Sequence, residues 1–194
     1  MSQTPPKTPS SLCAIILAAG KGTRMGSDLP KVVHHVGGRP MVSIVADACR
    51  EVGCGLLVAV VGHGREHVED ALAGDAEVRF AFQAEQLGTG HAVLAAESEL
   101  ADVSPQADVL VLCGDGPLIR AQTLRSLIDT HVRTQAAATM ATAVVDDPSG
   151  YGRIVRDEDG RFARIVEQKN ATDAELDIRE INPSYYCFKL GPLM

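Results

Sequence analysis

The sequence lacks an excess of positive charge and lacks any long apolar run. Its 18 Lys and Arg side chains are outnumbered by 25 Asp and Glu, which gives a formal net charge of −7 at pH 7. Non-specific nucleic-acid binding needs a basic face, so this balance argues against a nucleic-acid partner. The apolar run at residues 12–19 is far shorter than the roughly 18 residues of a membrane span. It follows a tail of Pro, Ser and Thr, so we expect neither a signal peptide nor a membrane partner.

No C-x-x-C pair occurs among the five cysteines, which are Cys13, Cys49, Cys54, Cys113 and Cys187. An odd number of scattered cysteines is typical of reduced, mostly buried thiols in a cytosol. Cys13 and Cys113 lie in apolar runs, where we expect them to pack as small hydrophobic side chains and not to act as nucleophiles. The sequence therefore predicts a cytoplasmic protein.

The composition is that of a folded domain. Of the 194 residues, 45% are hydrophobic and 22% are charged, which is enough for one domain with a sizeable core. Residues 1–11 are polar and rich in proline, so we expect them to form a disordered tail. Residues 12–194 are expected to form the domain itself.

Buried strands alternate with helices along most of the chain. Apolar runs bounded by turn residues predict strands at residues 12–19, 56–61 and 109–113, and residues 78–82 predict a further strand. Apolar residues at helical spacing predict helices at residues 40–52, 65–73, 89–100 and 121–132. This alternation predicts an α/β fold with a Rossmann-like, doubly wound and mostly parallel sheet.

The last third of the chain has a different pattern. Residues 136–145 and 179–189 each predict a strand. Residues 153–156 and 161–166 flank an acidic turn and predict a hairpin. No internal repeat occurs, and in particular no hexapeptide pattern of a left-handed β-helix.

A glycine loop follows the first predicted strand. Gly20 and Gly22 would let the backbone approach a phosphate closely, and Arg24 and Lys31 supply positive charge nearby. Met25 stands where the dinucleotide fingerprint requires glycine, and the order of Lys and Gly differs from that of a Walker A motif. The loop therefore predicts phosphate binding of another kind, with a plain glycine turn as the alternative.

Two further clusters follow strands at the same expected sheet edge. Asp115 comes after the strand at residues 109–113, where a carboxylate could hold Mg²⁺; an Asp in a β-turn is an equal alternative. Gln83, Gln86 and Thr89 carry groups that can read a base edge. A polar N-cap of the helix at residues 89–100 is the more common meaning of such a segment. His63 and His67 lack a third ligand nearby, so they do not predict a zinc site.

Together these motifs resemble the sugar-1-phosphate nucleotidyltransferases. Within that family, the chain is most similar to the uridyltransferase domain of the bacterial bifunctional uridyltransferase/acetyltransferases. The loop at residues 17–25 with Leu29, Pro30 and Lys31 is similar to the family's signature loop, and residues 83–91 are similar to its uracil-reading segment. Residues 150–154, 165–167 and 180–182 resemble its sugar-pocket segments. The fold implied is the nucleotide-diphospho-sugar transferase type.

The resemblance implies a role for each matching position. The reaction implied is uridylyl transfer from UTP to N-acetylglucosamine 1-phosphate, with Mg²⁺ as the cofactor and UDP-N-acetylglucosamine as a peptidoglycan precursor. Arg24, Lys31 and Asp115 would be catalytic, and Asp115 would also bind the metal. The nucleotide and sugar would be bound by Leu17, Ala18, Ala19, Gly20, Lys21, Gly22, Gln83, Gln86, Gly88, Thr89, Gly114, Gly152, Glu167 and Asn182.

Several positions depart from the family pattern. Tyr usually stands at Cys113, a larger apolar residue at Gly116, and Thr-Gly at Pro183-Ser184. These departures keep two alternatives open, namely a related nucleotidyltransferase with a different sugar phosphate and a catalytically weakened nucleotide-sugar-binding module. Family domains also continue past residue 194 to an Asn that is a second Mg²⁺ ligand, so we expect this domain to lack its C-terminal end. The oligomeric state stays open.

Overall fold

The computed structural model describes residues 11–20, 22, 25–74 and 77–194. The predicted site residues Lys21 and Arg24 lie outside this part of the chain, as does nearly all of the predicted tail. The chain forms two compact units. Unit 1 consists of the residues up to Thr139 together with Tyr186–Met194, and unit 2 consists of Met140–Tyr185. Each unit is described by itself.

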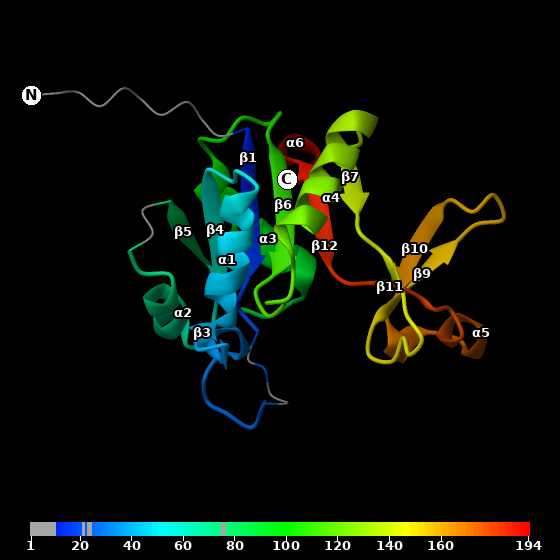
Figure 1. Ribbon diagram of the computed structural model, residues 1–194, viewed down its shortest axis with the longest axis horizontal. Coiled ribbons are helices and arrows are strands. Elements are labelled where there is room, and N and C mark those ends of the chain that lie inside the picture. Colours follow the sequence, from blue (N-terminus) through cyan, green and yellow to red (C-terminus); the bar gives the residue numbers. More distant parts are fainter. Residues whose placement is uncertain (1–10, 21, 23–24, 75–76) are drawn as a thin grey trace, which may run out of the picture. The chain divides into compact units, whose positions relative to one another are not determined.

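Unit 1 is built on a six-stranded sheet with the order β5-β4-β1-β6-β12-β7. Strand β1 pairs in parallel with both β4 and β6, and β4 pairs in parallel with β5. The predicted doubly wound, mostly parallel sheet is therefore confirmed, and Figure 1 shows these strands side by side. The strands are β1 (Leu12–Leu17), β4 (Leu56–Val61), β5 (Val78–Phe82), β6 (Asp108–Cys113), β7 (Ala138–Met140) and β12 (Tyr185–Lys189).

Helices cover both faces of this sheet. Helices α1 (Met41–Glu51) and α4 (Ala121–Thr134) contact each other and lie in front of the strands in Figure 1, whereas α3 (Thr89–Ala95) lies behind them. Because successive strand residues point to opposite faces, strands covered on both sides are apolar throughout. One core cluster joins Ile15, Val60 and Val111 to Ala92 and Val93 of α3.

The remaining elements of unit 1 are short. Helix α2 (Arg65–Ala71) follows β4, and α6 (Leu190–Leu193) follows β12. The predicted helix at residues 89–100 is divided into α3 and a 3₁₀ turn at Glu97–Leu100. A small hairpin of β2 (His35–Val36) and β3 (Arg39–Pro40) precedes α1 and was not predicted. Among the described residues, no helix combines the length and the apolarity needed to cross a membrane.

Unit 2 contains a four-stranded sheet with the order β10-β9-β11-β8. The predicted hairpin is confirmed as the antiparallel pair β9 (Gly152–Arg156) and β10 (Phe162–Val166). Its turn is held by the Asp157 carboxylate, which accepts hydrogen bonds from the backbone N–H groups of Asp159 and Arg161. The short helix α5 (Asp173–Leu176) begins with a capping box between Thr172 and Glu175.

Two predicted strands are each divided in two, so the prediction of a single strand was wrong in both places. Residues 136–145 form β7 in the first sheet and β8 (Ala143–Val144) in the second. Residues 179–189 form β11 (Glu180–Asn182) in the second sheet and β12 in the first. At the second break Pro183 lacks an N–H for the strand ladder and Ser184 adopts a left-handed φ of 64°, which ends the pairing of β11.

All five cysteines are free, as the sequence predicts. Burial raises the pKa of Cys13 and of Cys187 to about 12. These two thiols are therefore protonated at neutral pH, and because the thiolate is the reactive form they are poor nucleophiles. This supports the interpretation of Cys13 as a small packing residue.

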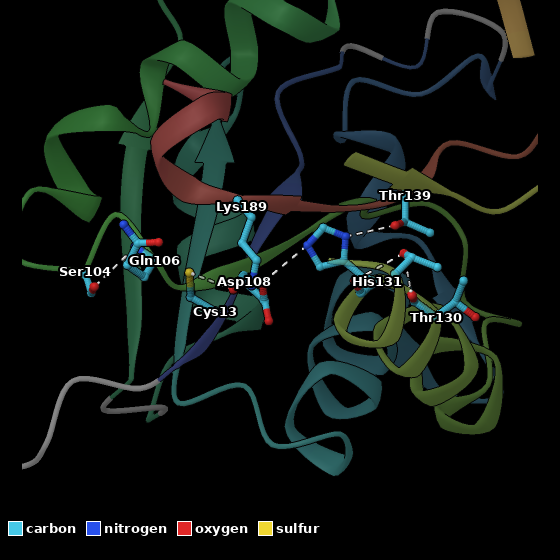
Figure 2. A network of polar contacts seen from close by, with 9 residues as sticks. Cys13, Ser104, Gln106, Asp108, Thr130, His131, Thr139 and Lys189 are labelled. Carbon is cyan, nitrogen blue, oxygen red and sulfur yellow. Dashed lines mark hydrogen bonds and ion pairs between the residues drawn. The ribbon is translucent and has the colours of Figure 1, made fainter. Parts of the chain in front are cut away.

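A largely buried polar network surrounds Asp108 at the start of β6 (Figure 2), whereas the predicted site residue Asp115 follows the end of that strand. The fully buried His131 of α4 places Nδ1 2.9 Å from Oγ1 of Thr139 and Nε2 3.3 Å from Oδ1 of Asp108. Nζ of Lys189 lies 2.5 Å from the same carboxylate oxygen. The Cys13 thiol donates to the backbone oxygen of Asp108. The network ties α4, β6, β7 and β12 together.

This network predicts that unit 1 loses stability in mild acid. Burial, and secondarily Lys189, lower the pKa of His131 below its ordinary value of 6.5, although Asp108 opposes the shift. As the pH falls below 6.5, His131 takes up a proton in the unfolded chain more readily than in the folded chain, so the free energy of unfolding falls as the pH falls. Urea unfolding at pH 7.5 and 5.5 should show a smaller pH effect in His131→Asn, which keeps a polar group facing Thr139 but cannot titrate. Equal pH effects in the two proteins would contradict this.

Candidate active site

Loops from the carboxyl ends of β1, β5 and β6 meet at a cavity of about 460 Å³ in unit 1. It is lined by Leu17, Ala19, Gly20, Gly22, Lys31, Val32, Gln83, Gln86, Gly88, Thr89, Ala92, Cys113 and Asp115. Most of the predicted nucleotide-site residues described in the structure are therefore brought together in one place. Ala18 and Gly114 are buried beside the cavity and do not line it.

The register of the sheet explains why these loops meet. Leu17 and Cys113 are parallel partners at the ends of β1 and β6, and the N–H of Gly114 donates to the carbonyl of Leu17 over 2.9 Å. On the other side, the N–H of Gln83 donates to the carbonyl of Val61 over 2.8 Å. The loops that follow these strands therefore leave the sheet at the same edge, where ligands of open parallel sheets bind.

Lys31 is held by the short 3₁₀ turn η2 (Lys31–Val33), whose Val32 and Val33 are buried. Its backbone touches the glycine loop. A Cβ added to Gly22 would lie only 2.6 Å from the Cβ of Lys31, and Gly22 has a left-handed φ of 61°. Only glycine fits this approach without strain. The loop and the lysine therefore form one packed element.

The ammonium of Lys31 lies 2.7 Å from Oδ2 of Asp115. The two side chains are 44% and 33% exposed, so both charges are accessible to a ligand in the cavity. An exposed pair of this kind adds only about 0–1 kcal/mol to folding stability. Its value to the protein is therefore the placement of one positive and one negative group at the same cavity wall.

The two glutamines of the cavity are fixed by the chain around them. Gln83 is only 4% exposed; its Nε2 lies 3.0 Å from Nδ1 of His91 and 3.4 Å from the carbonyl oxygen of Gly88. Nε2 of Gln86 donates to the carbonyl of Ala19 over 2.5 Å, which links the segment after β5 to the glycine loop. His91 was not assigned a role from the sequence.

The alternative meaning of this segment, a polar N-cap, is wrong. The N-cap of α3 is Gly88, at a φ of 108°, and no side chain caps the helix. Thr89 is the first residue of the helix and lines the cavity. The side chains of Gln83, Gln86 and Thr89 are therefore not used up as helix caps, although the two glutamine amides bond to neighbouring loops.

Unit 2 brings the predicted sugar residues together by itself. Asn182 of β11 and Gly152 of β9 are antiparallel partners. A Cβ at Gly152 would lie 3.0 Å from Ile165 and 3.4 Å from Oε1 of Glu167, so the missing side chain leaves room for that carboxylate. The backbone N–H of Ser184 donates to Oδ1 of Asn182 over 3.0 Å. The three predicted residues therefore meet at one end of this sheet.

The cavity suits a metal ion that is coordinated partly by the protein and partly by a substrate. Among the described residues, no three His, Cys, Asp or Glu side chains gather as a metal site would require. Mg²⁺ needs less from a protein, since it takes one or two carboxylates together with water and phosphate oxygens. Asp115 is a partly exposed carboxylate at the cavity wall and fits that pattern.

Comparison with known proteins identifies the family to which the chain belongs. The model of the MobA-like NTP transferase domain matches residues 14–163, which contain the whole cavity. The chain belongs to this family of NTP transferases. The matched segment runs from β1 to β10, so the family assignment covers both the glycine loop and the carboxylate after β6.

Curated relatives with high identity are bifunctional GlmU proteins. The chain is 51% identical over 177 residues to the protein of Syntrophomonas wolfei and 52% identical over 179 residues to that of Bacillus cereus. These alignments cover 91% and 92% of this chain, but only 38% of each relative. The chain thus spans well under half the length of the curated relatives it matches.

Solved structures with lower identity share the fold. HddC from Yersinia pseudotuberculosis, crystallised with GMP-PN, superposes with a TM-score of 0.68 at 22% identity. A Bacillus anthracis protein described as a glucose-1-phosphate thymidylyltransferase, crystallised with sucrose, gives 0.73 at 16% identity. The superpositions cover 91% and 92% of this chain, and 76% and 72% of the other chains. They support the nucleotidyltransferase-like fold.

Proposed function

We propose that this chain transfers a uridylyl group from UTP to N-acetylglucosamine 1-phosphate, giving UDP-N-acetylglucosamine and pyrophosphate. The observation that carries the proposal is that one cavity is lined by Gly20 and Gly22 of the glycine loop, by Lys31 and Asp115, and by residues of the Gln83–Thr89 segment. The identity of about half with bifunctional GlmU proteins supports the choice of substrates. The five free cysteines fit a reducing cytoplasm, where we expect the reaction to take place.

The chemistry needs little more than the residues at this cavity. An anionic oxygen of the sugar phosphate attacks the α-phosphorus of UTP, the new P–O bond forms, and the bond to the β-phosphate oxygen breaks as pyrophosphate leaves. The nucleophile is already ionised, so no base has to remove a proton. The difficulty is bringing anions together, which makes positioning and charge neutralisation the main catalytic effects.

Each part of the cavity has a task in this scheme. Gly20 and Gly22 leave the backbone open to the phosphates, and Lys31 places an ammonium where negative charge gathers. Arg24 would add a second cation from the same loop. Asp115 would hold Mg²⁺, which supplies further charge neutralisation when bound. In unit 2, Gly152, Glu167 and Asn182 would bind the N-acetylhexosamine.

A different sugar phosphate is the second candidate. Pro183 and Ser184 stand beside Asn182, and the N–H of Ser184 already bonds to the Asn182 side-chain oxygen. That contact removes one lone pair of Asn182 from sugar recognition.

The test is a panel of triphosphates and sugar phosphates with Mg²⁺, followed by pyrophosphate release. We expect UTP with N-acetylglucosamine 1-phosphate to give the highest kcat/KM. Release with UTP but a preference for glucose or galactosamine 1-phosphate would favour the second candidate. Calorimetric binding of UDP-N-acetylglucosamine without pyrophosphate release at high protein concentration would instead identify a nucleotide-sugar-binding module and contradict the proposed reaction.

A further inference from the structure

Among the described residues, the Gln83 side chain makes two polar contacts, and both are made by its amide nitrogen. Nε2 lies 3.4 Å from the carbonyl oxygen of Gly88 and 3.0 Å from Nδ1 of His91. Gln83 is almost completely buried and lines the cavity that we assign to the nucleotide. How this amide is oriented therefore decides which kind of hydrogen-bonding group it can present there.

The Gly88 carbonyl fixes that orientation. A carbonyl oxygen can only accept, so the amide nitrogen of Gln83, and not its oxygen, must face Gly88. The second amide hydrogen then points to Nδ1 of His91, which must accept it. His91 is consequently the tautomer that carries its proton on Nε2. With both N–H groups engaged, the remaining hydrogen-bonding group of Gln83 is its oxygen, an acceptor.

We propose that His91 is a positioning residue that holds the Gln83 amide with its oxygen available to the base, and so selects uracil over cytosine. The inference rests on the proposed function, since it concerns the base of the same nucleotide. Uracil presents an N–H donor at N3, whereas cytosine in the same pose presents a lone pair, which would face the Gln83 oxygen. A buried acceptor facing an acceptor is unpaired and unfavourable.

Two substitutions at position 91 separate positioning from packing. His91→Leu removes the nearer acceptor, at 3.0 Å, and leaves only the 3.4 Å contact with the Gly88 carbonyl to hold the Gln83 amide, so that a turned amide, which presents a donor, becomes less unfavourable. His91→Asn keeps an acceptor, Oδ1, at nearly the same distance from the backbone as Nδ1. His91→Ala gives the same comparison as the leucine variant if that protein does not fold. The readout is the ratio of the dissociation constants of CTP and UTP, measured by calorimetry without the sugar phosphate.

We expect the wild type and His91→Asn to bind UTP more tightly than CTP by a similar factor. In His91→Leu that factor should shrink by about tenfold, the scale of one or two hydrogen bonds. A merely structural role would weaken both nucleotides equally and leave the ratio unchanged; that result, or an equal loss of the ratio in His91→Asn, would overturn the inference. A wild type that binds no UTP would instead overturn the proposed function.

Discussion

Lys31→Ala should lower kcat/KM for uridylyl transfer by about 10²-fold or more and leave the fold intact. The ammonium of Lys31 stands at the cavity wall 2.7 Å from Asp115, and its removal takes away charge stabilisation that the transition state needs. Losing one such group typically costs a factor of 10² to 10³ in rate. Steady-state pyrophosphate release and urea unfolding, measured on the same preparation, test both halves of this prediction.

The control for Lys31→Ala is a second exposed ion pair. Arg39 lies 2.6 Å from Asp47, with side chains 54% and 59% exposed, and neither residue lines the cavity. Arg39→Ala should therefore change stability as little as Lys31→Ala, by about 0–1 kcal/mol, but should keep wild-type turnover. A Lys31→Ala protein that retains more than a third of the wild-type rate would refute the role of Lys31.

Gly22→Ala should be the second most damaging change, with turnover lowered by roughly ten- to hundredfold. The added methyl group would lie 2.6 Å from the Cβ of Lys31, closer than side-chain atoms approach, so the glycine loop or η2 must move. A displacement of about 1 Å at a reacting centre can cost 10²-fold in rate. The same assay measures it, and the loss should be in kcat more than in the folded fraction.

Gly26→Ala is a matched control in the same loop. Gly26 has a φ of 59°, close to the 61° of Gly22, but a Cβ there would meet nothing within 4 Å. Both variants therefore carry the cost of placing alanine in a left-handed conformation, and only Gly22→Ala collides with Lys31. Equal turnover in the two variants would show that the contact with Lys31 has no catalytic importance.

The sequence predicts the strands of the parallel sheet well because β1 and β4 are complete apolar runs, and β5 and β6 each contain a single charged residue, Arg79 and Asp108. The bounds of β4 and β5 agree with the prediction residue for residue. The same signal fails at residues 136–145 and 179–189, where strand-like residues continue across the point at which the chain passes from one sheet to the other. Sheet membership depends on pairing partners far away in the chain, and a local pattern does not contain them.

The candidate site likewise combines residues that the sequence predicts with contacts that it does not. Gly22, Lys31 and Asp115 can be assigned from the loops that follow strands, because parallel strands deliver their carboxyl ends to one edge. The direct pairing of Lys31 with Asp115, and the contact of Gln86 with Ala19, are long-range side-chain contacts that no spacing predicts. His91 ends the segment at residues 83–91 that resembles the uracil-reading segment, but nothing in that pattern indicates its contact with Gln83.

The central claim is that this chain joins UTP to N-acetylglucosamine 1-phosphate, and ³¹P NMR of the complete reaction tests it most directly. With Mg²⁺ and wild-type protein, we predict that the diphosphate signals of UDP-N-acetylglucosamine and the signal of pyrophosphate rise together in equimolar amounts. Lys31→Ala at the same concentration should give almost none. Unchanged UTP and sugar-phosphate signals with the folded wild type, or equal product from Lys31→Ala, would contradict the account.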